Sequence, residues 1–255
     1  MRKYRSGAMT LLALLGLAVA PALGNSITFT SELDEASDYS NATLVTNANA
    51  STATLTVSSG TDVSFTTNIN TDSDAGSFAR YTVESAATFD PSVTGPLESI
   101  DWSLDIRKSG GDSTALLFPA LFQGGSIFVY NANDISGGDR TDSFRPTGSS
   151  NPSYDAASLT GAMASDFDEF DESSTPDDLT PDDEFVTLET NPDFSASGGE
   201  ITFGYMTISA TGDGDTAVRV AEVQNSEIVV NYIPEPASLA LLGLGGALIA
   251  FRRRV

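Results

Sequence analysis

Along most of the chain, hydrophobic and polar residues alternate with a period of two, the spacing of a β-strand that buries one face. The stretch 100–107 shows the pattern most clearly, with Ile100, Trp102, Leu104 and Ile106 on one face and polar residues on the other. Further strands are expected at 52–57, 63–67, 79–83, 115–122, 127–130, 201–205, 217–223 and 228–232. About ten short strands in a body of roughly 200 residues, separated by turns rich in glycine and serine, favour an all-β antiparallel sandwich over a parallel α/β sheet. One helical turn is expected near 158–167, and the acidic, proline-containing stretch 166–184 is expected to form a surface loop.

The N-terminal residues depart from this alternation. Basic residues among the first five positions precede an apolar stretch from Ala8 to Ala20, and Ala22 to Gly24 then supplies small residues. This order is typical of a secretory signal peptide, and the small-residue cleavage site argues against a retained N-terminal anchor. The sequence therefore predicts a signal peptide at 1–24, removed by signal peptidase before Asn25, and a single folded domain at 25–232.

The last residues form a second segment that does not suit a folded domain. Pro234-Glu235-Pro236 is followed by an uncharged apolar run from Ala237 to Phe251 and then by Arg252, Arg253 and Arg254. The prolines end the preceding strand, and the arginines match the positive residues that flank a membrane segment on its cytoplasmic side. As a helix this run reaches about 22 Å, short of the roughly 30 Å hydrocarbon core. We expect a short hydrophobic helix that holds the chain in the membrane transiently; an ordinary C-terminal anchor is the alternative.

This three-part segment resembles the PEP-CTERM sorting signal of Gram-negative bacteria. Pro234, Glu235 and Pro236 correspond to the namesake tripeptide, and the three arginines to its basic end. The resemblance implies that residues 233–255 are recognised by an exosortase, an integral-membrane processing enzyme, with cleavage near Pro-Glu-Pro. It also implies export across the inner membrane to the cell surface or the extracellular matrix.

Composition removes several kinds of chemistry. The chain has no cysteine and no histidine, so disulfides, Ser-His-Asp or Cys-His nucleophiles and typical zinc sites are excluded. It has 35 acidic and 12 basic residues and a net charge of −23, and six of the basic residues lie in the two end segments. A body this acidic repels nucleic acid and anionic lipid, so neither is expected as a partner.

A fainter resemblance covers the body. Residues 191–205 resemble a block found in PEP-CTERM proteins of the concanavalin/laminin-G-like sandwich type. The stretch Phe78 to Tyr81, the strand with Trp102, and Glu227 to Val230 lie where that type places its early and last strands. The resemblance implies a jelly-roll-like β-sandwich and contact with glycans, and it brings no ligand residues with it.

Calcium is the one cofactor for which the sequence offers candidate ligands, and a simple turn is preferred over it as the explanation of these residues. Asp213 and Asp215 flank Gly214 and place alternate carboxylates as the start of a calcium loop does. The pattern does not continue, because 217–224 is expected to be a strand, and a tight Asp-Gly turn explains the three residues equally well. The stretch Thr52 to Thr56 carries alternate threonines without repeating at a fixed period, so it does not predict a flat ice-binding array.

Two functions from different classes remain. Glycoside hydrolases need two carboxylates about 5–10 Å apart, and the Glu-x-Asp-x-x-Glu string that would place them on one strand is absent. We therefore expect no enzyme but an exported surface or extracellular-matrix protein, retained in exopolysaccharide or biofilm and binding glycan. Trp102 lies on an apolar face, so Tyr130 and Tyr154 are the better candidates for glycan contact. A secreted polysaccharide hydrolase of the same fold is the alternative.

Overall fold

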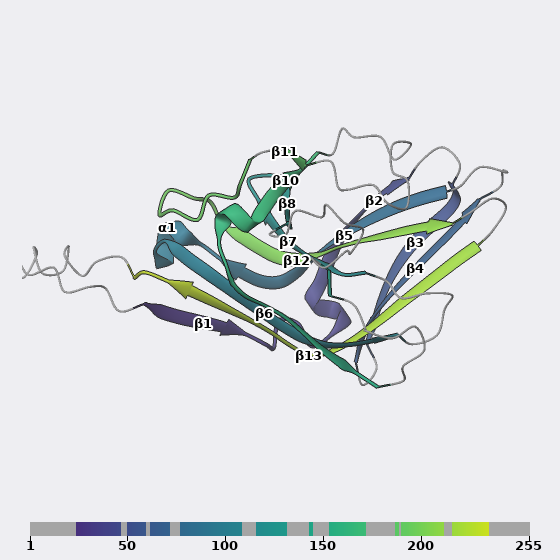
Figure 1. Ribbon diagram of the computed structural model, residues 1–255, viewed down its shortest axis with the longest axis horizontal. Helices are drawn as coiled ribbons and strands as arrows, with labels where there is room; N and C mark the ends of the chain where they lie inside the picture. Colours follow the sequence, from purple (N-terminus) through teal and green to yellow (C-terminus); the bar gives the residue numbers. More distant parts are fainter. Residues whose placement is uncertain are drawn as a thin grey trace, which may run out of the picture.

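The computed structural model describes residues 24–46, 50–59, 62–71, 77–108, 116–131, 143–144, 153–171, 187–188, 190–211 and 216–234. Within them the chain forms two antiparallel sheets that lie face to face (Figure 1). The alternation of apolar and polar residues explains this arrangement, because each sheet must bury one face against the other. The expected all-β sandwich is confirmed.

The first sheet, sheet A, has the strand order β3-β4-β13-β6-β9, and β1 pairs beside β13. Its strands are β1 (Asn25–Phe29), β3 (Ala50–Ser59), β4 (Val63–Thr71), β6 (Leu97–Lys108), β9 (Asp155–Ala162) and β13 (Thr216–Tyr232). The long strand β13 lies in the centre, since β6 pairs along one side of it while β4 and then β1 pair along the other.

The second sheet, sheet B, has the strand order β11-β10-β8-β7-β12-β5-β2. Its strands are β2 (Tyr39–Thr46), β5 (Ser77–Phe89), β7 (Phe118–Gln123), β8 (Ser126–Tyr130), β10 (Phe167–Phe170), β11 (Thr187–Leu188) and β12 (Ile201–Thr211). Gly124 and Gly125 join β7 to β8 in a two-residue turn with positive φ at both positions, as a tight hairpin with matching twist requires.

Helical structure among the described residues is confined to α1 (Pro91–Thr94) and two 3₁₀ turns, Ala36–Asp38 and Ala164–Asp166. The helical turn expected near 158–167 is thus limited to three residues, and the rest of that stretch is mainly β9. The loop expected at 166–184 is wrong at its start, where 167–170 forms β10. There Ser126 donates a hydrogen bond to Glu169 and Asn131 donates one to Asp168, so donors on or beside the neighbouring strand satisfy the acidic side chains.

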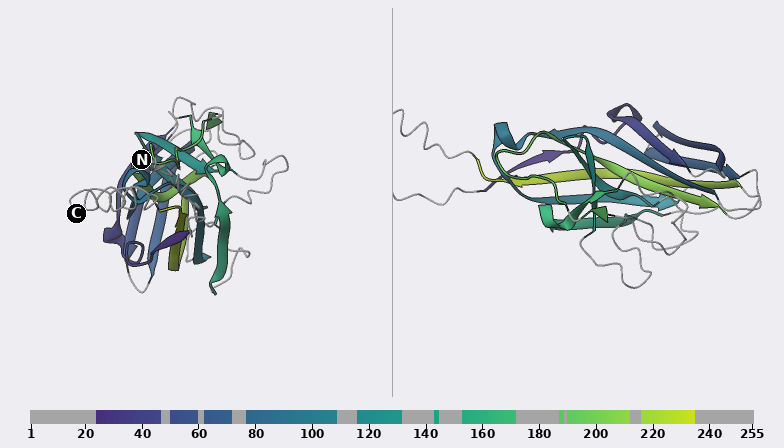
Figure 2. Two further views of the ribbon diagram at one scale, coloured as in Figure 1. Left: turned by 90° about the vertical axis from the view of Figure 1, so that its left-hand side faces the viewer. Right: turned by 90° about the horizontal axis from the view of Figure 1, so that it is seen from above.

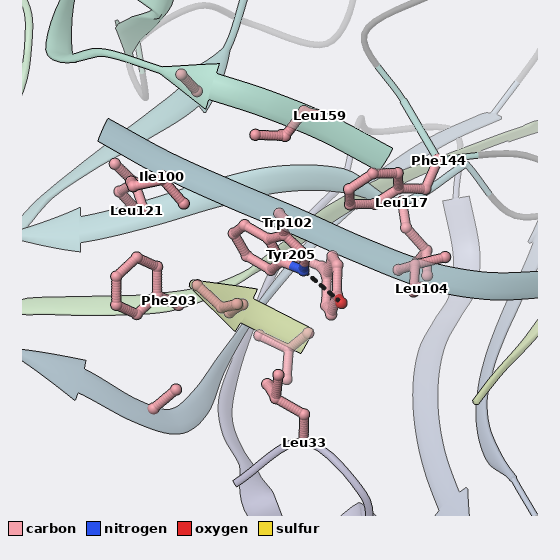
Figure 3. Close-up of a cluster of buried hydrophobic side chains, with 14 of the residues drawn as sticks. Leu33, Ile100, Trp102, Leu104, Leu117, Leu121, Phe144, Leu159, Phe203 and Tyr205 are labelled. Carbon is pink, nitrogen blue, oxygen red and sulfur yellow. Dashed lines mark hydrogen bonds between the residues drawn. The ribbon is translucent and has the colours of Figure 1, made fainter. Parts of the chain in front are cut away.

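The main core lies between the two sheets and is built on aromatic side chains. Trp102 is completely buried on β6, as its place in the alternation predicted, and faces Phe203 and Tyr205 of β12 (Figure 3). The Trp102 Nε1–H group donates a hydrogen bond to the Tyr205 hydroxyl at 3.2 Å. The rings of Trp102 and Phe203 meet nearly at right angles, with centroids 6.0 Å apart. The contact between Trp102 and Tyr205 is therefore a polar contact enclosed in a mainly apolar core.

Sheet B also carries a second apolar cluster. Phe128 of β8 belongs to the main core, whereas its neighbours Ile127 and Val129 are buried with Phe118, Ala120, Phe170 and Met206 in a separate group. Successive residues of a strand point to opposite faces, so the central strands of sheet B bury both faces. This explains why 127–130 is a continuous apolar run rather than an alternating one.

The first and last described strands are neighbours. Asn25 of β1 is paired with Tyr232 of β13, and the pairing continues to Phe29 and Ile228. Both views of the elongated body place the start of β1 beside the end of β13 at the same end as α1 (Figure 1, Figure 2). Residues 1–23 of the expected signal peptide and the expected helix at 237–251 lie outside the described residues. Among the described residues, no helix has the length and apolar character needed to cross a bilayer.

Candidate functional site

The segment that resembles a sorting signal begins where the central strand of sheet A ends. Tyr232 is the last residue of β13, and the Ile233 amide donates a hydrogen bond to the Pro96 carbonyl at 2.9 Å. Pro234 follows directly and cannot donate to a sheet, which is the strand-ending effect that the sequence predicted. Glu235, Pro236, Arg252, Arg253 and Arg254 lie outside the described residues.

Side chains hold this end of β13 firmly to the body. The Tyr232 ring packs against Phe89, with centroids 5.8 Å apart. The Asn231 side-chain amide donates to Ser99 Oγ and to Asp101 Oδ2, both at 3.2 Å. Hydrogen bonds and ring contacts thus reach to within two residues of Pro234, so the sorting segment follows the folded body without a spacer.

A charged cluster lies across sheet A on the face opposite to the core. Arg107 of β6 is paired in register with Glu222 of β13, and Glu222 in turn with Ser64 of β4. Arg107 Nη2 lies 2.6 Å from Glu222 Oε2 and 3.3 Å from Asp62 Oδ2, and Arg107 Nε also donates to Glu222. We name Asp62, Arg107, Tyr154 and Glu222 the Arg107 cluster.

Tyr154, one of the two tyrosines proposed for glycan contact, belongs to this cluster. The Arg107 guanidinium lies over its ring, 4.5 Å from the centroid, as in a cation–π contact. Burial raises the pKa of the Tyr154 hydroxyl well above its ordinary value, and the neighbouring Asp62 carboxylate raises it further. One face of the ring is therefore occupied by arginine rather than open to a sugar.

The Arg107 cluster has the composition of a site but the contacts of a structural network. Two carboxylates converge on one guanidinium nitrogen, so these oxygens lie at most about 6 Å apart, too close for the separation of roughly 6.5–9.5 Å that inverting glycosidases use. Both carboxylates already accept hydrogen bonds from Arg107. As arranged, the cluster ties the turn before β4 to β6 and β13 with fixed charges.

Tyr130, the second proposed glycan contact, lies on β8 of sheet B, whereas Tyr154 precedes β9 of sheet A. Its ring packs edge-on against Phe167, with centroids 5.5 Å apart, and is partly buried against the main core. The structure therefore does not bring the two tyrosines onto one sheet. Among the side chains that the structure describes, the large exposed hydrophobic ones are Val93, Met163 and Leu188, none of them aromatic.

Asp213 and Asp215, the candidate calcium ligands, fall between β12 and β13, outside the described residues. In the described part of the chain, acidic residues form no group of three or more that could hold a metal ion. The calcium loop therefore stays a prediction from the sequence.

Sequence reasoning did not anticipate that Gln123 of β7 fixes the loop at 191–199. The Gln123 amide donates to the carbonyls of Asp193 and Gly199, at 2.9 and 2.8 Å, and accepts from the Asp193 amide at 2.7 Å. Hydrogen bonds from Ser195 lower the pKa of the Asp193 carboxyl. The only signal in the sequence was the turn-rich composition of this block, which gives no hint of a partner on β7.

Comparison with known proteins agrees with the C-terminal segment. The family described as the PEP-CTERM protein-sorting motif matches residues 233–254. No curated protein matches the chain. The motif implies processing by an exosortase, export, and a place at the surface or outside a Gram-negative bacterium. Directly behind its central strand, this β-sandwich chain carries a PEP-CTERM protein-sorting motif.

Proposed function

We propose that this chain is a non-catalytic protein of the cell surface or exopolysaccharide matrix, delivered there through its PEP-CTERM motif. The observation that carries the proposal is the junction between body and motif: the family match begins at residue 233, directly after the last residue of β13. The folded body and the processing signal therefore occupy consecutive parts of the chain, as in a protein that is delivered by its C-terminal signal.

The absence of catalysis is part of this proposal. Asp62 and Glu222, which converge at Arg107, are both engaged by its guanidinium. A glycosidase needs one carboxyl group free to donate a proton and a second free to act on the sugar or on water. The contacts at Arg107 favour a binding or structural role over hydrolysis.

The ligand that we propose is the exopolysaccharide of the producing cell, with calcium as the bridging ion. The support is the resemblance of the 191–205 block to sandwich proteins that contact glycans, together with the strongly acidic composition. A divalent cation links carboxylates of a protein to anionic groups of a polymer that would otherwise repel it.

Intact mass of the exported protein tests the sorting step. We expect a product without Phe251 to Val255, and Glu235→Gln should accumulate uncleaved precursor because it alters the namesake tripeptide. Glu227→Gln is the matched control, since Glu227 is an exposed residue of β13 outside the motif. A mature protein that retains Phe251 to Val255, or equal processing of both variants, contradicts the sorting proposal.

Binding to the purified exopolysaccharide, with calcium and with a chelator, tests the biochemical role. We expect binding without release of soluble sugar, and loss of binding on chelation. Asp213→Asn with Asp215→Asn should reproduce that loss, whereas Asp34→Asn, a control at an exposed position, should not. Release of sugar by the unmodified protein would establish the hydrolase alternative instead.

A further inference from the structure

The outer edge of sheet A at β3 is long and is regular from Thr52 onward; at its far end the Ala36 amide donates a hydrogen bond to the Ser59 hydroxyl. Among the described residues β3 pairs with β4 alone, over Ala50 to Ser59, and the register shifts only once, between Ala50 and Thr52. An edge strand presents a row of unpaired backbone N–H and C=O groups, which is a template for another strand.

The other edges of the two sheets are blunted. β1 has five residues and β11 has two. β9 begins with Asp155, and its pairing with β6 is irregular near Gly161, which has φ of 69°. β2 has a register shift between Ser40 and Thr43. Shortness, charge and bulges are the devices that keep edge strands from pairing, and β3 shows none of them from Thr52 to Ser59, beyond the register shift at its start.

The stretch of sequence that supplies β3 and its neighbours carries few charges, although the acidic 3₁₀ turn Ala36–Asp38 contacts β3 near Ser59. From Tyr39 to Thr71 the sequence has one charged residue, Asp62, in a chain with 35 acidic and 12 basic residues. This stretch supplies β2, β3 and β4, which lie together at the end of the body away from α1 (Figure 1). Copies of so acidic a protein repel one another within a screening length of roughly 8 Å, and a side with few charges is where two copies meet with the least repulsion.

The side chains of β3 are self-complementary about Leu55. Thr52, Thr54, Thr56 and Ser58 are exposed on the outer face, whereas Ala53, Leu55 and Val57 are half-buried toward the core. A two-fold axis at Leu55 places Thr54 opposite Thr56 and Thr52 opposite Ser58 of the second strand. It also places Ala53 opposite Val57 and Leu55 opposite itself, so hydroxyl groups meet hydroxyl groups and apolar groups meet apolar groups.

We propose that β3 pairs antiparallel with β3 of a second copy of this chain, so that two copies of sheet A form one continuous sheet. The interface is isologous: the same strand serves both copies, as closed two-fold symmetry requires. Burial of Leu55 against Leu55, and of Val57 against Ala53, of the second copy adds apolar contact to the backbone hydrogen bonds. A partner of different sequence would not gain the pairing of like with like about Leu55.

The molar mass of the exported protein, measured by sedimentation across concentration and at two salt concentrations, tests this pairing. We expect a dimer, favoured by added salt because salt screens the repulsion between the acidic bodies. Thr54→Glu with Thr56→Glu sets like charges directly opposite each other across the axis, and should weaken the dimer by about tenfold or more.

The matched control is Thr66→Glu with Asn68→Glu. These positions on β4 lie directly opposite Thr56 and Thr54 in the register, on the same face, and add the same charge one strand away from the edge. We expect this control to keep the dimer. A monomeric parent protein, an edge variant that stays dimeric, or equal weakening by both variants overturns the proposal.

Hydrogen exchange of the unmodified protein supplies a readout that does not depend on the folding of a variant. Backbone amides of 50–59 that point away from β4 should exchange more slowly at high protein concentration than at low concentration. Those of β9, the opposite edge of sheet A, should not change. Exchange at 50–59 that is independent of concentration overturns the proposal.

Discussion

Replacing Tyr205 by phenylalanine removes a single oxygen atom from the middle of the sandwich. Tyr205 is fully buried on β12, and its hydroxyl accepts the hydrogen bond of the Trp102 indole at 3.2 Å (Figure 3). The phenylalanine ring can keep the contacts with Trp102 and Phe65, whose centroids lie 5.2 and 5.5 Å away. The substitution therefore isolates the effect of the hydroxyl group.

The expected cost follows from the indole donor left behind. An unsatisfied buried donor costs about 1–3 kcal/mol, so we expect the free energy of unfolding to fall by about 2 kcal/mol. In a domain of roughly 200 residues each kcal/mol lowers the melting temperature by about 2–4 °C, so the melting temperature should fall by about 4–8 °C.

Chemical and thermal unfolding of the exported protein, followed by tryptophan fluorescence, measure both quantities, and Trp102 is the only tryptophan of the chain. Tyr232→Phe is the control, because that ring is partly exposed and should tolerate the change within about 0.5 kcal/mol. Trp102→Phe, alone and combined with Tyr205→Phe and followed by circular dichroism, completes a double-mutant cycle with an expected coupling of about 1 kcal/mol. If the free energy of unfolding of Tyr205→Phe lies within about 0.5 kcal/mol of the parent value, the hydrogen bond does not stabilise the core.

Three further predictions concern other parts of the body. Burial raises the pKa of Tyr205 to about 12 and that of Tyr39 well above its ordinary value, because the folded body favours the neutral hydroxyl. The stability that these two groups contribute is therefore complete below pH 10 and should be lost as the pH rises from about 10 to 12. Urea midpoints across that range measure it, and constant midpoints would contradict it. Gly204→Ala should destabilise the body by about 2 kcal/mol or more, because the added Cβ would lie 2.1 Å from a carbonyl oxygen of β5; Gly199→Ala, with open space at its Cβ, is the control for its melting temperature. Gln123→Ala should make the loop at 191–199 more sensitive to proteolysis, while the cleavage rate elsewhere in the body stays unchanged. A loop that stays as resistant as in the parent would show that the three hydrogen bonds of Gln123 are dispensable.

The sequence was most informative where structure depends on neighbours along the chain. The alternation around Trp102 predicted both the strand and the buried face, and the two prolines at the motif predicted where β13 ends. The strand at 167–170 was missed, because its acidic residues resemble a solvated run until Ser126 and Asn131 supply donors from or beside β8. Long-range partners of this kind have no local signal.

The same distinction separates the two kinds of candidate site. The sorting motif is a linear signal, read directly from consecutive residues and matched as such. The Arg107 cluster joins residues from β6, from β13 and from just before β4 and β9, and only the sheet register brings them together. For the same reason the sequence proposed Tyr154 as an open ring and could not show that Arg107 covers it.

The pairing of β1 with β13 makes the order of events during export part of the folding problem. During export from the N-terminus onward, β1 can pair only after β13, the last strand of the body, has emerged. β13 is also the central strand of sheet A, so a chain interrupted before residue 216 lacks the strand that joins β4, β6 and β1. Such a product would lack the sorting motif as well. Completion of the sandwich and possession of the sorting motif therefore coincide: a product that lacks β13 also lacks the motif.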